Sequence, residues 1–275
     1  MAPHKTKAII LKVNPYRESS CILYLFTEHH GLVHGIIKGA RRKKSGIPSL
    51  ERGFCAELLL YTRPHRELHT LAAIAILDYY PGLRTDLYKN AVRDMAFEVI
   101  LATVSPDSPH PELFSYLSRF LRLLETRPHT QCFPGMAWRF LYDFSGLMGF
   151  GPNIDTCASC GGRLSGKNGA YLFLESGTLL CGACAPLCGK GGAFLPPAVL
   201  ALLSETAGLE HQEEIERMPG QEVRRISHQL ARYCQYHFQH YADFKSLEFL
   251  DSLCTIATGN AARTPAAGAT KRTAS

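Results

Sequence analysis

The first third of the chain holds short runs of β-branched and aromatic residues separated by turn residues, which is typical of β-strands. The predicted strands are Lys5–Val13, Ser20–Thr27, Leu32–Lys38, Phe54–Tyr61 and Glu67–Leu77. Five short strands in succession, mostly without a helical segment between them, predict a small closed barrel, and an OB-type barrel is the natural candidate. An SH3-like barrel is the alternative, because the number of strands does not separate the two folds.

After Pro81-Gly82 the apolar residues recur at the 3.6-residue period of α-helices. The predicted helices are Thr85–Val104, Pro111–Leu124, Pro134–Met148, Pro197–Leu203, Gln221–His240 and Lys245–Ile256. A cysteine-rich window separates the first three helices from the last three, and we expect the two groups to pack into one domain. The end of the chain is rich in Ala, Thr and Gly without an apolar period, which predicts a disordered tail.

These elements predict an α+β multidomain protein. We expect an OB-fold domain at 1–80, a helical domain formed by 81–152 and 193–257, a cysteine-rich insertion at 153–192 and the tail at 258–275.

The chain has 275 residues, of which 46% are hydrophobic, so wholesale disorder is excluded. The longest uncharged stretch has 14 residues, too few to span a bilayer. Lysines interrupt the first apolar residues of the chain, which leaves no continuous apolar segment for a secretory signal. We therefore expect a soluble, cytoplasmic protein.

Positive charge is concentrated in the predicted barrel. Residues 1–80 hold 12 lysines and arginines against six acidic residues, whereas the remainder holds 18 of each, so the first third carries the whole net charge of +6. Such asymmetry indicates a negatively charged partner, most often nucleic acid. The densest run directly follows the third strand, and we expect Arg17 in the preceding turn to extend it. The candidate DNA-binding residues are Lys38, Arg41, Arg42, Lys43, Lys44 and Arg17.

A run of like charges is often no more than a solvated loop. Its place on a predicted OB barrel favours binding, because that fold combines a basic groove with aromatic side chains on which bases stack. Four aromatic residues are available for stacking, although strand alternation places about half of each strand in the core. They are Tyr16, Tyr24, Phe26 and Tyr61.

Ten cysteines divide into five scattered ones and five in a short window. Cys157 and Cys160 form one Cys-x-x-Cys pair, and Cys181 and Cys184 form a second one 20 residues later. Two such pairs joined by a hairpin predict a zinc ribbon with one structural Zn²⁺, since four thiolates leave no open coordination position. Iron or an Fe–S cluster is the lesser alternative. Cys188 is a spare thiol that could replace Cys184.

Catalytic signatures are weak. His65-Arg66-Glu67 matches half of a deaminase signature, but it lies about 90 residues before the cysteines, and Thr156 stands where that signature has proline. Residues 161–168 fit a phosphate-binding loop except that Asn168 replaces the Mg²⁺-binding hydroxyl, and they follow a cysteine pair instead of a buried strand. We therefore predict a binding protein and not an enzyme.

Several segments, in order from about residue 5 to residue 256, resemble the bacterial RecO family of recombination-repair proteins. They are Lys7-Ala-Ile-Ile-Leu-Lys, Tyr16-Arg17-Glu18-Ser19-Ser20, Leu25-Phe26-Thr27-Glu28, Lys38-Gly39-Ala40-Arg41, Arg139-Phe140-Leu141, Gly149-Phe150-Gly151-Pro152, both cysteine pairs, and Lys245-Ser246-Leu247-Glu248-Phe249-Leu250. The resemblance implies an OB-fold, a helical domain and an inserted zinc ribbon. It implies binding of single- and double-stranded DNA, annealing of complementary strands, and help in loading RecA onto strands coated by single-stranded DNA-binding protein (SSB).

The resemblance also implies partners. They are the RecR ring, which the OB domain would contact, the acidic C-terminal tail of SSB and, indirectly, RecA and RecF. In that family the SSB tail docks on the helical domain, where Arg139 matches a basic position and Trp138 lies beside it, so both are candidates for this contact. A nucleoid-associated place in the cytoplasm follows from these partners. Two other classes stay open: a zinc-ribbon transcription or translation factor with a basic barrel, and a hydrolytic zinc enzyme.

Overall fold

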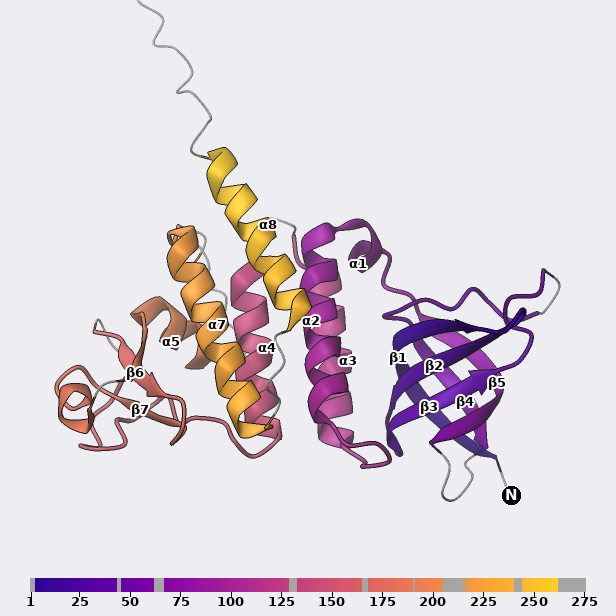
Figure 1. The fold of residues 1–275 in the computed structure, drawn as a ribbon, viewed down its shortest axis with the longest axis horizontal. Helices are drawn as coiled ribbons and strands as arrows, with labels where there is room; N and C mark the ends of the chain where they lie inside the picture. The colour runs from indigo at the N-terminus through magenta and orange to yellow at the C-terminus, as the bar shows by residue number, and fades with distance from the viewer. Residues whose placement is uncertain are drawn as a thin grey trace, which may run out of the picture.

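The computed structural model describes residues 3–43, 46–61, 67–128, 133–164, 168–189, 191–204, 215, 217–239 and 244–261. The molecule is elongated, with a β-barrel at one end, a layer of helices in the middle and a small three-stranded sheet at the other end (Figure 1). The barrel and the small sheet therefore lie far apart, and the helices connect them.

The N-terminal barrel consists of β1 (His4–Tyr16), β2 (Ser20–Thr27), β3 (Gly31–Ile37), β4 (Cys55–Tyr61) and β5 (Leu68–Asp78). The strands follow the order β1-β2-β3-β5-β4, and β4 pairs with β1 to close the barrel. Only β3 and β5 pair in parallel; the other pairs are antiparallel. This closed Greek-key arrangement of five strands is that of an OB-fold, so the OB-type prediction is confirmed over the SH3-like alternative.

Both faces of β1 are buried where the barrel meets the helices. Ala8 and Ile10 belong to the core inside the barrel, whereas Ile9 and Leu11 belong to a second core shared with the helices. Phe26 of β2 joins that second core. Its ring centroid lies 6.1 Å from that of Phe114. A strand buried on both sides explains the uninterrupted apolar run of residues 8–11, and it attaches the barrel firmly to the helices.

The helices come from two separated parts of the sequence. The first part supplies α1 (Pro81–Thr85), α2 (Leu87–Thr103), α3 (Pro111–Thr126) and α4 (Phe133–Leu147), and the second supplies α5 (Pro197–Ser204), α7 (Gly220–His237) and α8 (Lys245–Ala261). The two parts pack together, α2 against α8 and α4 against α7. Glu98 of α2 accepts hydrogen bonds from the backbone N–H groups of Lys245 and Ser246, which begin α8, at 3.1 and 2.8 Å.

Three features differ from the sequence prediction. The short helix α1 starts at Pro81, where the sequence predicted only the end of the barrel domain. The carboxylate of Glu125 accepts hydrogen bonds from the backbone N–H groups of Gly82 and Leu83 at the start of this helix, both at 2.8 Å. A third ribbon strand, β8 (Ala193–Leu195), is too short to show alternation. Helix α8 continues past Ile256 to Ala261, and the rest of the predicted tail, 262–275, lies outside the described residues.

The turn between β2 and β3 packs directly on the segment that joins α2 to α3. Gly31 has a φ of +64°, and a Cβ at this position would lie 1.9 Å from the backbone oxygen of Ser108. Gly46 has nearly the same φ, +68°, but no atom within 4 Å of its Cβ position. A side chain at either position would therefore meet the same backbone strain, but only at position 31 would it also clash with a neighbouring atom.

We expect Gly31→Ala to lower the free energy of unfolding by about 3 kcal/mol or more, and Gly46→Ala by only about 1 kcal/mol, because the left-handed conformation alone costs about 1–2 kcal/mol. Denaturant unfolding of both variants measures the difference. Equal losses would show that the turn does not pack on Ser108.

Candidate metal centre and nucleic-acid interface

The four paired cysteines lie at the tips of two turns at the end of the small sheet. This sheet consists of β6 (Ala170–Phe173), β7 (Thr178–Leu180) and β8, with β6 in the middle. The first turn is closed by hydrogen bonds from the backbone N–H of Cys157 to the carbonyl of Gly162 (2.8 Å) and from that of Gly161 to the carbonyl of Cys157 (2.9 Å). Gly161 adopts a φ of +70°, which favours glycine at this position. The hairpin thus brings the two pairs together, as the spacing predicts.

The sulfur atoms of Cys157, Cys160, Cys181 and Cys184 all lie within 4.8 Å of one another. The Sγ atoms of Cys160 and Cys181 are 3.9 Å apart. A tetrahedral ion with Zn–S bonds of about 2.3 Å requires sulfur–sulfur distances of about 3.8 Å, so the four side chains fit such an ion with small adjustments. Within the described ranges, no other group of three or more His, Cys, Asp or Glu side chains converges in this way.

Backbone N–H groups favour the thiolate form of the buried member. Burial raises the pKa of Cys157, but hydrogen bonds from the backbone N–H groups of Cys160, Cys181 and Ser159 outweigh it and lower the pKa to about 6. The N–H of Cys181 lies 3.4 Å from this sulfur. Thiolate is the form that binds a metal ion, so the first turn favours ligation at Cys157.

Cys184, not Cys188, completes the cluster. Cys184 follows Cys181 in a tight turn in which its backbone N–H donates to the carbonyl of Cys181 at 3.1 Å. Cys188 ends the following 3-10 helix η2 (Ala185–Cys188), where it is exposed. The cluster therefore offers four protein ligands to one ion. The phosphate-loop residues 165–167 and the deaminase-like His65 and Arg66 lie outside the described residues.

The basic loop after β3 is exposed. Lys38, Arg41, Arg42 and Lys43 are all exposed to solvent, and Lys44 lies outside the described residues. The backbone N–H of Arg41 donates to the carbonyl of Ser19 at 2.9 Å, and its Nη1 donates to the carbonyl of Arg17 at 3.3 Å. The β1–β2 turn is therefore held against the loop, so that the exposed Arg17 and the loop arginines form one basic surface.

The candidate stacking residues divide between core and surface. Phe26 is fully buried and cannot stack on a base. Tyr24 is half-buried on the outer face of β2, where its ring lies 4.3 Å from that of His34 and 5.4 Å from the Nζ of Lys12. Burial lowers the pKa of His34, which favours a neutral ring.

Lys12 and His34 did not stand out in the sequence. They flank Tyr24 only because the strand register pairs Lys12 with Tyr24 and Tyr24 with His34. Alternation could have placed all three on the outer face, but only the register makes them neighbours.

Trp138 is a core residue, and its prediction as a partner contact is wrong. Its side chain is 0% exposed, and its Nε1–H donates to the Oγ of the buried Ser227 on α7 at 2.9 Å. The neighbouring Arg139 is half-buried. Its Nε donates to Asp143 at 2.7 Å, and its Nη1 donates to the carbonyls of Leu202 and Leu203 at 3.3 and 3.4 Å, near the end of α5. The helical period places Trp138 on the face of α4 that packs against α7. Of the two neighbouring residues, Arg139 is the one that is partly exposed.

We expect Trp138→Phe to lower the free energy of unfolding by about 2 kcal/mol or more, because it leaves a void and a buried hydroxyl without its donor. Ser227→Ala should destabilise as well, and the double variant should lose less than the sum of the two losses, since both polar partners are then gone. Chemical denaturation tests this coupling. Unchanged stability of Trp138→Phe would contradict the burial of this residue and would restore it as a candidate contact for a partner.

The fold and the site together define a class of proteins: an OB-type barrel joined to a helical domain that is interrupted by a four-cysteine ribbon. The family model "Recombination protein O N terminal" matches residues 1–80, and "Recombination protein O C terminal" matches residues 84–248. The chain therefore belongs to the RecO family, and its role lies in DNA repair and recombination.

Curated relatives named DNA repair protein RecO agree with this assignment. The protein of Geobacter metallireducens is 33% identical over 208 residues, which cover 74% of this chain and 80% of the relative. Those of Prosthecochloris aestuarii and Chlorobium luteolum are each 28% identical, over 86% and 90% of this chain and 92% and 98% of the relatives. None of the helices in the described part of the chain is long and apolar enough to cross a membrane.

Proposed function

We propose that this chain is a recombination mediator without enzymatic activity. It binds single- and double-stranded DNA, anneals complementary strands and assists the loading of RecA onto strands coated by SSB. The observation that carries the proposal is the basic surface of the barrel, where hydrogen bonds from Arg41 hold the β1–β2 turn against the exposed loop. The family and the names of its members support the setting of DNA repair.

The basic surface suits annealing on physical grounds. Two complementary strands are polyanions that repel each other, and arginines and lysines that neutralise phosphates reduce this repulsion and release counterions. Such contacts do not depend on the base sequence. This independence is required of a protein that anneals strands of any sequence. The rings of Tyr24 and His34 on the outer face of the barrel supply a surface for sequence-tolerant stacking.

The metal ion of the cysteine cluster is Zn²⁺ in this proposal, and its role is structural. All four positions of a tetrahedral ion are filled by cysteine sulfur, which leaves no position for a substrate or a reactive water. Zinc is favoured because four thiolates in a tetrahedral arrangement are its common structural set. Each side chain of the cluster acts only as a ligand.

The proposed protein partners are RecR, which contacts the OB domain, and the C-terminal tail of SSB, which docks on the helical domain. RecA and RecF follow indirectly, and the site of action is the nucleoid in the cytoplasm. Arg139 supports the SSB contact, because its guanidinium is held in place by Asp143 and by two carbonyls near the end of α5 while part of it stays accessible. An acidic group of the tail would share this guanidinium with Asp143.

Annealing of bare complementary strands without a nucleotide cofactor tests the proposal. Fluorescence energy transfer between labelled strands should rise much faster with the protein than without it, and equally for unrelated sequences. A protein that instead binds one duplex or RNA sequence selectively and does not anneal would be the zinc-ribbon transcription or translation factor. Turnover of a substrate that Cys184→Ser abolishes while the fold is kept would favour the hydrolytic enzyme.

A further inference from the structure

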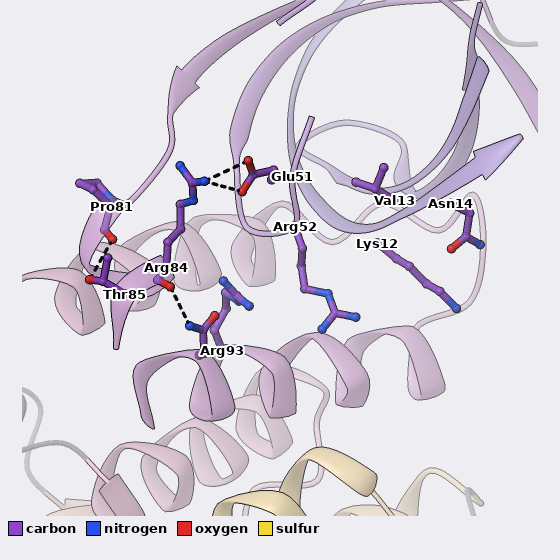
Figure 2. Close-up of a pocket in the computed structure, with 10 residues that line it drawn as sticks. Lys12, Val13, Asn14, Glu51, Arg52, Pro81, Arg84, Thr85 and Arg93 are labelled. Carbon is purple, nitrogen blue, oxygen red and sulfur yellow. Dashed lines mark hydrogen bonds and ion pairs between the residues drawn. The ribbon is translucent and has the colours of Figure 1, made fainter. Parts of the chain in front are cut away.

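A cleft of 820 Å³ separates the barrel from the first two helices. One wall comes from β1 and from the segment before β4, with Lys12, Asn14 and Arg52; the other comes from α1 and α2, with Arg84 and Arg93. Figure 2 shows Lys12 and Arg52 extending from the barrel toward the helical wall. The volume lies within the range of about 300–1,000 Å³ that is usual for ligand sites.

The cleft is basic. Lys12, Arg52, Arg84 and Arg93 line it, and the acidic groups that face these four are Glu51 and Asp94, which leaves a balance of +2. Arg84 pairs with Glu51 at 2.9 Å. Asp94 is shared, because it contacts Arg52 at 2.5 Å and Arg93 at 2.7 Å.

Ion pairs and aromatic rings contact the arginines that line the cleft. Arg93 is only 7% exposed, its Nε and Nη2 both donate to the same Asp94 oxygen, and its guanidinium lies 6.0 Å from the ring of Phe97. Arg84 lies 5.7 Å from the ring of Phe54. A buried arginine is weak support for stability, since desolvation offsets its ion pair. A guanidinium group is nevertheless suited to phosphate recognition, because its planar array of donors matches phosphate oxygens.

We propose that this cleft binds the sugar–phosphate backbone of single-stranded DNA. This inference rests on the proposed DNA binding and extends it beyond the basic loop to the helical domain. Strand β1 connects the two places: Lys12 at the cleft and Arg17 beside the loop are five residues apart, roughly 17 Å at 3.4 Å per residue. Lys12 also lies beside Tyr24, so one strand can pass from the loop over the Tyr24–His34 pair into the cleft.

The competing explanation is purely structural. The ion pair of Arg52 with Asp94 joins the barrel to α2, and the cleft residues could serve only to fix the two domains. The two explanations differ in the sign of one effect. If Asp94 only fixes the domains, Asp94→Asn lowers stability and does not strengthen DNA binding; if the cleft binds phosphate, the same change removes a repelling charge and raises the affinity for DNA.

Matched pairs of variants in the full-length protein test the proposal, with anisotropy of labelled oligothymidylate measured across a salt series. Lys12→Gln is compared with Lys5→Gln, the same change on the same strand at an exposed residue that pairs with Glu57. Asp94→Asn is compared with Glu57→Gln. Lys12→Gln should reduce the slope of log K against log salt by about 0.7, the value for one phosphate contact on a single strand, and Asp94→Asn should raise affinity; the two controls should do neither.

The outcomes separate the two proposals. If the unaltered protein binds no oligothymidylate, the proposed function and this inference both fail. If it binds, and Lys12→Gln behaves like Lys5→Gln, the cleft is not a phosphate site and the proposed function stands on the basic loop alone. Because Lys12 is exposed, its comparison decides the matter even if Asp94→Asn loses stability.

Discussion

Replacement of Cys157 by serine is expected to abolish stoichiometric zinc binding and to unfold the tip of the ribbon. Cys157 is the buried ligand, and backbone N–H groups converge on its sulfur. Structural zinc contributes about 10–16 kcal/mol in isolated zinc-finger peptides, which is as much as the whole stability of an ordinary domain. A ribbon of three short strands has too small a core of its own to replace that contribution.

The loss should be local. The turn between β6 and β7 is attached to α7, because Nε2 of His237 lies within hydrogen-bond distance, 3.1 Å, of the carbonyl of Leu174. Hydrogen exchange should therefore lose protection at residues 157–163 and 181–188, while α7 keeps most of its protection. Elemental analysis should find one zinc per unaltered chain and none in Cys157→Ser.

Cys188→Ser is the matched control, since Cys188 is exposed and outside the cluster. It should keep both the zinc and the exchange pattern. An unaltered protein that is folded and holds no zinc, after growth with ample zinc, would contradict the metal assignment. A coloured protein with stoichiometric iron would replace zinc by iron or an Fe–S cluster.

The triple change Lys38/Arg41/Arg42→Ala should weaken binding to single-stranded DNA by a similar factor for every sequence. Three lost phosphate contacts should reduce the slope of log K against log salt by about 2, at about 0.7 for each contact. Sequence independence is expected because phosphate contacts carry no base information. A salt series with oligonucleotides of different composition measures both effects.

The matched control removes the same charge from exposed arginines of α3 and α7: Arg119, Arg122 and Arg232. Their replacement by alanine should change the slope little, because these residues lie outside both the basic loop and the cleft. Equal changes in both triple variants would show that net charge alone, and not the loop, governs binding. Unchanged affinity of the loop variant at low salt would remove the loop as a site.

The barrel strands could be predicted closely because they are short runs rich in β-branched and aromatic residues, bounded by turn residues. Strand β1 is the exception: it continues to Tyr16, three residues past the predicted end, after an irregularity between Ile10 and Lys12 that interrupts the pattern. Spacing alone identified the four cysteines that converge, because two Cys-x-x-Cys turns have few other uses. It left Cys188 open as a replacement for Cys184, and the exclusion of Cys188 depends on the turn after Cys181.

Features that depend on tertiary contact could not be predicted. The cleft joins Lys12, Arg52 and Arg93, which are separated by about 40 residues at each step and share no local pattern. The burial of Trp138 depends on Ser227 of a helix that follows the ribbon. In both cases the residue types were visible in the sequence, and only the packing of the two helical groups and the barrel showed what they contact.

Annealing of complementary strands already coated with SSB, followed by fluorescence, tests the central claim most directly. The account predicts rapid annealing that collapses when the C-terminal tail of SSB is deleted, because a mediator recruited by that tail then loses its access to the coated strands. Absence of annealing on coated strands, by a folded and metal-loaded protein that binds DNA, would contradict the claim and favour a zinc-ribbon factor.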